Sequence, residues 1–132
     1  MKSKFSHETI PLHKTSSGST FEIDVWSYSH PKANETVYLQ AGIHGIEITG
    51  IPVVHEFIKE IEKHQLAYNF ICVPLSNPMG LDSQIMGVQT GYNNLHTNQQ
   101  NCWNWNRICN LRDEPSQEGH WIKTLMDISE KA

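Results

Sequence analysis

The sequence lacks the features of a disulfide-stabilised, secreted or membrane-spanning protein. Its three cysteines are an odd count without a Cys-X-X-Cys pair, so neither a disulfide framework nor a zinc knuckle is predicted. It contains no apolar stretch long enough to cross a bilayer, and its N-terminus lacks the apolar run of a signal peptide. We therefore expect a cytoplasmic protein.

Concentrated positive charge is absent as well. The formal net charge is −4, from 10 Lys and Arg residues against 14 Asp and Glu residues, and the basic residues form no run. Because nucleic acids and anionic membranes are bound by basic patches, we expect neither as a partner. A chain of 132 residues, 38% of them hydrophobic, can form one domain at most, with a modest core.

Patterns near the N-terminus predict a β-hairpin. Residues 9–13 form a short candidate strand, and apolar and polar residues alternate over residues 21–26. Between them, Ser16-Ser17-Gly18-Ser19 has the composition of a turn. We therefore expect two strands joined at this turn.

The next residues predict a βαβ unit. Thr36–Ala41 and Asn69–Pro74 are rich in β-branched, aromatic and apolar residues, as buried strands are. Between them, apolar residues recur at helical spacing from about Ile48 to His64. This order predicts a parallel pair of strands connected by a helix.

The remaining residues divide into a long loop and a last helix. Residues 76–114 are rich in Asn, Gln and Gly and have no sustained period, so we interpret them as a long functional loop. Ser116 is predicted to be the N-cap of a helix whose apolar positions are Trp121, Leu125 and Ile128.

The motif most indicative of a chemical function is His44-Gly45-Ile46-Glu47, between the predicted strand and helix. Side chains three residues apart on one helical turn share a face, so one divalent ion can bind both His44 and Glu47. Nitrogen and carboxylate ligands suit zinc, although a catalytic zinc site usually has three protein ligands. A His and a Glu at this spacing also occur by chance, so the prediction depends on context. Gly42 and Gly45 favour a tight turn, at a place where open α/β sheets bind ligands.

Two further motifs lie in the predicted loop. Ser76-Asn77-Pro78-Met79-Gly80-Leu81 is typical of a turn beyond the carboxyl end of the sheet, and it can equally be no more than a turn. The other motif is Asn104-Trp105-Asn106-Arg107. Arg107 and Arg112 are the only arginines after residue 66, so a substrate carboxylate near the metal has few bidentate partners. Arg107 can equally be a surface charge.

In this order, Ala41–Glu47, Asn77–Leu81 and Asn104–Arg107 resemble the succinylglutamate desuccinylase/aspartoacylase family of the zinc carboxypeptidase superfamily. The resemblance covers nearly the whole chain but only the N-terminal part of the family domain. It implies a truncated α/β fold, with an N-terminal β-hairpin followed by a mixed, mostly parallel sheet flanked by helices. We therefore expect residues 1–132 to form a single domain, the N-terminal portion of a zinc-carboxypeptidase-like catalytic domain.

The resemblance implies a hydrolase with a Zn²⁺ cofactor that cleaves an amide bond of an N-acyl amino acid or peptide-like substrate. Metal-activated water would attack the amide carbonyl. His44 and Glu47 would be the first two zinc ligands. Asn106, Arg107 and Asn77 would bind the substrate, a small molecule that carries a carboxylate.

The sequence also departs from the family pattern. The family's third ligand, a His, and its general-base Glu belong to later parts of the domain. Where the family usually has an arginine that stabilises the oxyanion, this chain has Tyr92, whose hydroxyl donates a hydrogen bond without a charge. Asn104 stands where the family often has Asp. Arg107 and Tyr92 are therefore the predicted catalytic residues of this chain.

The other histidines considered are poor replacements for the third ligand. We expect His55 and His64 to be solvated or packed residues of the helix after the motif, whereas His96 and His120 would reach a metal only by an accident of folding. Two functions therefore remain. The chain is either part of a zinc hydrolase, completed by a longer product or a second subunit, or a non-catalytic binding or structural module. A truncated sheet also predicts self-association through its exposed edge.

Overall fold

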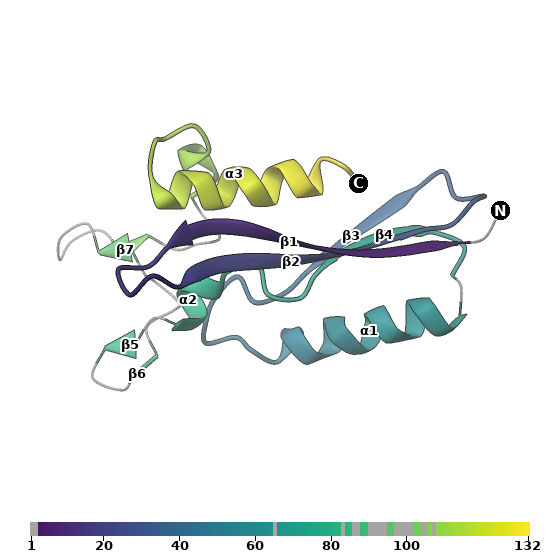
Figure 1. The fold of residues 1–132 in the computed structure, drawn as a ribbon, viewed down its shortest axis with the longest axis horizontal. Helices are drawn as coiled ribbons and strands as arrows, with labels where there is room; N and C mark the ends of the chain where they lie inside the picture. The colour runs from purple at the N-terminus through teal and green to yellow at the C-terminus, as the bar shows by residue number, and fades with distance from the viewer. Residues whose placement is uncertain are drawn as a thin grey trace.

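The computed structural model describes residues 3–64, 66–82, 84–85, 88–89, 95–96, 102–103, 106 and 108–132. Its main elements are a four-stranded sheet, helix α1 on one face of that sheet and helix α3 on the other (Figure 1). The strands of this sheet are β1 (Lys4–Lys14), β2 (Thr20–Ser29), β3 (Thr36–Gln40) and β4 (Asn69–Val73). The helices are α1 (Gly50–His64), α2 (Pro78–Asp82) and α3 (Gln117–Ser129), with a 3₁₀-helix η2 at Cys109–Leu111. Two-residue strands form two further ladders, β5 (Gln84–Ile85) with β6 (Val88–Gln89) and β7 (Leu95–His96) with β8 (Cys102–Trp103).

The predicted N-terminal hairpin is present and is longer than expected. β1 and β2 pair antiparallel over their full lengths, with one register shift between Pro11 and His13. In the connecting turn, the N–H of Thr15 donates to the carbonyl of Ser19 at 2.7 Å. Gly18 has a φ of +90° there, a conformation that glycine adopts without a steric penalty.

The βαβ prediction is also confirmed, because β3 and β4 pair parallel from Thr36 opposite Asn69 to Gln40 opposite Val73. Helix α1 connects them and begins two residues later than predicted. The prediction of a mostly parallel sheet is wrong for these four strands. Their order is β1-β2-β4-β3, and both the β1–β2 and the β2–β4 pairings are antiparallel. The physical reason is that a tight turn forces the hairpin to be antiparallel, and the hairpin joins the sheet through β2.

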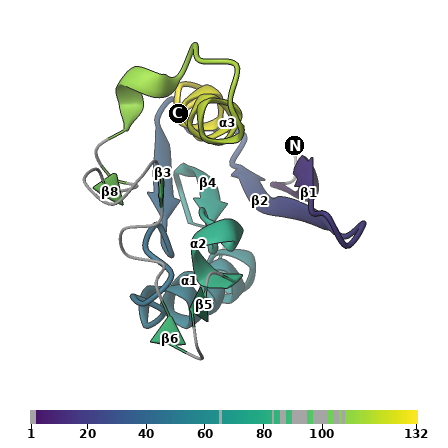
Figure 2. The same cartoon turned by 90° about the vertical axis from the view of Figure 1, so that its left-hand side faces the viewer.

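The alternation of side chains along the strands builds two cores, one on each face of the sheet. Figure 2 shows α3 and α1 on opposite sides of these strands. Ile23 and Val25 of β2 pack on the α3 side, around Trp121, which is fully buried. Tyr28 of β2 packs on the α1 side, together with α1 residues at helical spacing such as Val54. The sheet is thus covered by a helix on each face. The segments that follow β3 and β4 contain candidate site residues.

The long loop predicted over residues 76–114 contains more regular structure than expected, including α2 and η2. The last helix was predicted correctly. Its N-cap is Ser116, whose hydroxyl oxygen accepts a hydrogen bond from the N–H of Gly119 at 3.0 Å. Within the described part of the chain, no helix combines the length and the apolar character needed to cross a membrane.

Candidate metal and substrate site

His44 and Glu47 lie on one turn beyond the carboxyl end of β3. The N–H of Glu47 donates to the carbonyl of His44 at 3.0 Å, which closes this turn before α1 begins. The side chains face each other, with 3.1 Å between His44 Nδ1 and Glu47 Oε2. His44 is only 6% exposed, whereas the Glu47 side chain is 57% exposed. The three-residue spacing therefore brings the two groups together, on a turn of their own rather than on the first turn of the helix.

Two glycines allow the chain to make this turn. Gly42 has a φ of +65°, in the left-handed region that favours glycine. Gly45 lies so close to α2 that a Cβ on it would overlap the carbonyl of Gly80. The His44 turn and α2 are therefore in direct backbone contact.

Asn77 joins the ends of the two parallel strands and is fully buried. Its side-chain Nδ2 donates to the carbonyl of Ile43 at 2.9 Å, and its Oδ1 accepts from the N–H of Gly80 at 2.8 Å. Its own N–H donates to the carbonyl of Gly42 at 3.1 Å. In the structure, Asn77 therefore holds the His44 turn and the start of α2. Its predicted contact with substrate stays a prediction.

Ser76 adds a second connection at the same point, one that the sequence analysis did not assign. Its hydroxyl and its N–H both donate to the carbonyl of Ala41, at 2.8 and 2.9 Å. Its own carbonyl accepts from Trp121 Nε1 of α3 at 2.6 Å. The available sequence signal was a Ser-Asn pair directly after a buried strand, because such residues often hydrogen-bond to nearby backbone.

The other predicted site residues are placed only in part. Asn106 is exposed and lies on a groove of about 180 Å³, whose lining also includes Ile43 and Gln40. Arg107, Tyr92 and Asn104 lie outside the described residues. Of these four loop residues, the structure therefore places only Asn106, close to the residue that precedes His44.

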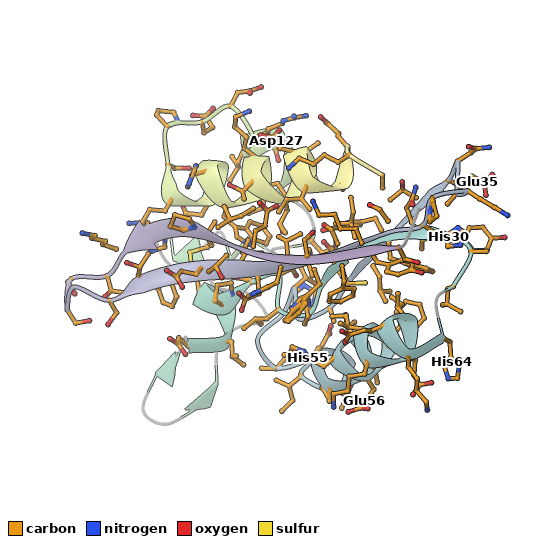
Figure 3. All side chains as sticks on the ribbon, turned by 45° about the vertical axis from the view of Figure 1, so that its right-hand side comes forward. His30, Glu35, His55, Glu56, His64 and Asp127 are labelled. Atoms are coloured by element: carbon orange, nitrogen blue, oxygen red, sulfur yellow. The ribbon has the colours of Figure 1, made fainter. Side chains whose placement is uncertain are left out.

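The described histidines elsewhere do not join the pair. His55 and His64 are exposed on α1, as expected, and Figure 3 shows both on that helix. His64 pairs with Glu60 at 2.8 Å, and His120 is exposed on α3. Within the described ranges, His, Cys, Asp and Glu form no cluster of three that could hold a metal ion.

Comparison with protein families identifies the chain. The model of the succinylglutamate desuccinylase/aspartoacylase catalytic domain matches residues 33–126, which is more than half of the sequence. The chain belongs to this family. The matched region contains the His44 turn, the Asn77 turn and Asn106, so the family assignment covers the whole candidate site. The family is one of hydrolases that are generally zinc-dependent.

Solved structures give the same fold assignment. A candidate succinylglutamate desuccinylase/aspartoacylase from Shewanella frigidimarina NCIMB 400 aligns with a TM-score of 0.67 and 23% identity, over 86% of this chain. A family protein from Shewanella amazonensis SB2B aligns with a TM-score of 0.67 and 25% identity, over 83% of this chain. The aligned parts are only 32% and 31% of those two structures, so this chain spans about a third of their length. No curated protein matches the sequence significantly.

The His44–Glu47 geometry fits a zinc ion. Zinc binds nitrogen and carboxylate oxygen at about 2.0–2.2 Å, so two such ligands of one ion lie at most about 4 Å apart. The separation of 3.1 Å between Nδ1 and Oε2 is within that limit. The imidazole of the pair is buried, whereas the carboxylate is exposed to solvent.

Proposed function

We propose that this chain is part of the catalytic unit of a zinc-dependent amidohydrolase of the succinylglutamate desuccinylase/aspartoacylase type. The observation that carries the proposal is the 3.1 Å approach of His44 Nδ1 to Glu47 Oε2, on a turn beyond the sheet that Asn77 holds by a hydrogen bond. Two ligands on one short turn are a bidentate anchor for a metal ion, and the family assignment makes zinc the expected ion.

Each residue has a defined task in this proposal. When bound, zinc supplies a water of lowered pKa and polarises the scissile carbonyl. His44 and Glu47 hold the ion, while Asn106 and Arg107 bind the carboxylate of a small-molecule substrate and so orient its amide bond. Tyr92 donates a hydrogen bond to the carbonyl oxygen as negative charge develops on it.

The proposal includes a further source of ligands, because two protein ligands leave half of a four-coordinate zinc sphere to water. The chain spans about a third of its structural relatives, and a longer product or a second polypeptide would provide the third ligand and the proton-transfer group. We therefore expect weak zinc binding and little turnover from the 132 residues alone. The longer product is expected to contain about one zinc per chain, and finding none in it would refute the proposal.

Isothermal titration of the 132-residue chain with zinc tests the anchor directly. His44→Ala is expected to lower zinc affinity at least about tenfold, since even changes outside the ligand shell commonly have effects of this size. The matched control is His120→Ala, which removes an exposed histidine from α3 and is expected to leave the affinity unchanged. Equal affinities for the wild-type chain and His44→Ala would contradict the assignment.

A second candidate is a binding or structural module without hydrolase activity. It is favoured by the small number of metal ligands, since the described residues contain no group of three metal-ligating side chains. Turnover assays with N-acyl amino acids separate the two candidates. Hydrolysis by the chain that disappears in His44→Ala would exclude the non-catalytic module.

A further inference from the structure

We propose that Trp121 of α3 is a positioning residue for the candidate metal site, because its indole N–H fixes the peptide unit that holds the chain just before His44. Trp121 is fully buried and belongs to a helix that comes much later in the chain than the His44 turn. The inference rests on the proposed function, since the position of the turn matters through the metal that the turn would bind. It adds a second group outside the ligand pair on which metal affinity depends.

Three consecutive carbonyls before the candidate metal ligands accept hydrogen bonds from the two residues that follow the β4 strand end. The N–H and the hydroxyl of Ser76 donate to the carbonyl of Ala41, at 2.9 and 2.8 Å. The N–H of Asn77 donates to the carbonyl of Gly42 at 3.1 Å, and its Nδ2 donates to that of Ile43 at 2.9 Å. The direction in which the chain enters the turn therefore depends on the orientation of these two residues.

The peptide unit between Ser76 and Asn77 is bonded on both of its sides. Its carbonyl accepts a hydrogen bond from Trp121 Nε1 at 2.6 Å, and its N–H donates to the carbonyl of Gly42 at 3.1 Å. Because a peptide unit is planar and rigid, a rotation that breaks one of these hydrogen bonds breaks the other. A donor at the carbonyl also polarises the N–H of the same unit, which strengthens the second hydrogen bond. Trp121 therefore acts on Gly42 through a single peptide unit.

Gly42 is a position where such an external contact has an effect. Its φ is +65°, and it is the residue at which the chain leaves the direction of β3. Glycine populates positive and negative φ about equally, so its own backbone preference does not fix the direction of its carbonyl. The hydrogen bond from Asn77 selects one conformation, and Trp121 orients the peptide unit that donates it.

Trp121 is itself held firmly. It lies on α3, which covers the face of the sheet opposite α1 (Figure 1), and it shares a core cluster with Ile23 and Val25 of β2. Side chains in such a close-packed interior have little freedom to move. Phenylalanine or leucine would fill this space without a donor, whereas a buried indole N–H requires an acceptor. The acceptor here is Ser76, so the core of the sheet delivers a directed contact to the site.

Zinc titration of Trp121→Phe tests the consequence for the metal. Phenylalanine retains an aromatic ring and removes the N–H, and we expect the zinc dissociation constant to rise about three- to tenfold, below the range for direct partners of a ligand. Ile128→Val is the matched control, because Ile128 is a buried α3 residue of the same core cluster. It is expected to lower stability but leave zinc affinity unchanged, since affinity is measured on folded protein. Equal affinities for Trp121→Phe and the wild-type chain would overturn the proposal.

Amide hydrogen exchange, followed by NMR on the metal-free chain, tests the peptide unit without zinc. The readout is the exchange rate of the Asn77 amide relative to that of Ile71 in the central strand β4, which corrects for global destabilisation. We expect Trp121→Phe to raise this ratio on the order of fivefold, the size expected for one net hydrogen bond. Ile128→Val is expected to leave the ratio unchanged.

A closer substitute removes the N–H at nearly constant volume. Replacement of Trp121 by 3-benzothienylalanine keeps both fused rings and substitutes sulfur for the N–H, so it is expected to fold and to raise the same exchange ratio. An unchanged ratio in this variant would refute the positioning role. A wild-type chain that binds no zinc would refute the proposed function instead, while the exchange ratio would still decide whether Trp121 fixes the chain before His44.

Discussion

At the residue scale, the side chain of Asn77 connects two parts of the candidate site. It hydrogen-bonds to both the His44 turn and the start of α2, in a position without solvent access. A buried amide with both ends bonded to backbone is difficult to replace, because no other side chain of that size donates and accepts at the same two points. The position of the predicted metal ligands therefore depends on a residue outside the pair.

Asn77→Ala tests this dependence. The substitution leaves the carbonyl of Ile43 and the N–H of Gly80 without their partner in a buried place, at roughly 1–3 kcal/mol for each group. We expect the free energy of unfolding, measured by urea denaturation, to fall by about 2–6 kcal/mol. Asn110→Ala, at an exposed residue of η2, is the control and is expected to change it by less than about 0.5 kcal/mol. A similar small effect of Asn77→Ala would contradict the assigned role.

Gly45 provides a second test at the same scale. A Cβ at this position overlaps the carbonyl of Gly80, so Gly45→Ala must move the His44 turn away from α2. We expect it to lower stability by about 1–3 kcal/mol and to weaken zinc binding. Gly18→Ala, in the distant hairpin turn, introduces strain of its own because φ is +90° there, but it is expected to leave zinc affinity unchanged. Unaltered zinc affinity in Gly45→Ala would show that the turn does not need this close approach.

At the element scale, Arg112 attaches the segment after η2 to the end of α3. Its guanidinium donates to Glu130 Oε1 and to Asp127 Oδ1, both at 2.7 Å, and Figure 3 shows Asp127 on that helix. The hydrogen bond from Arg112 is the largest cause that holds the pKa of Asp127 below its usual value, and that from Lys123 adds to it. These hydrogen bonds hold the end of η2 against the last turn of α3.

This arrangement predicts a pH-dependent effect of Arg112→Ala. Because the folded-state pKa of Asp127 is lowered, its contribution to stability is present above the unfolded-state pKa, about 4, and is lost as the pH falls through the folded-state pKa. We expect Arg112→Ala to lower the melting temperature at pH 7, with a smaller difference from the wild-type protein at pH 2–3. Lys59→Ala, which breaks an exposed pair with Glu56, is the control and is expected to have little effect at either pH. A pH-independent effect of Arg112→Ala would contradict the ionic origin.

The elements also show what could be predicted from sequence. The parallel β3–β4 pair, α1 and the Ser116 cap have local signals, namely buried apolar runs, helical spacing and a capping residue, and all are present. The sheet order was not predictable in this way, because the antiparallel contact between β2 and β4 joins distant residues without a local pattern. Helix α2 was missed because five residues, Pro78–Asp82, are too short to display a helical period.

At the scale of the whole molecule, the chain belongs to a family domain and contains the turn that is proposed to bind the metal. The family assignment was reached from three short motifs because their order constrains the sequence more than any one of them does. Their spatial relation required the structure, which brings the His44 and Asn77 turns into direct contact and places Asn106 on the groove beside Ile43.

The central claim is that the His44–Glu47 turn binds zinc, and anomalous diffraction tests it most directly. Data collected at the zinc absorption edge from crystals grown with zinc locate the ion without assuming its ligands. The account predicts a peak about 2.0–2.2 Å from both His44 Nδ1 and Glu47 Oε2. A peak only at other residues, or none near this turn in a zinc-containing crystal, would contradict it.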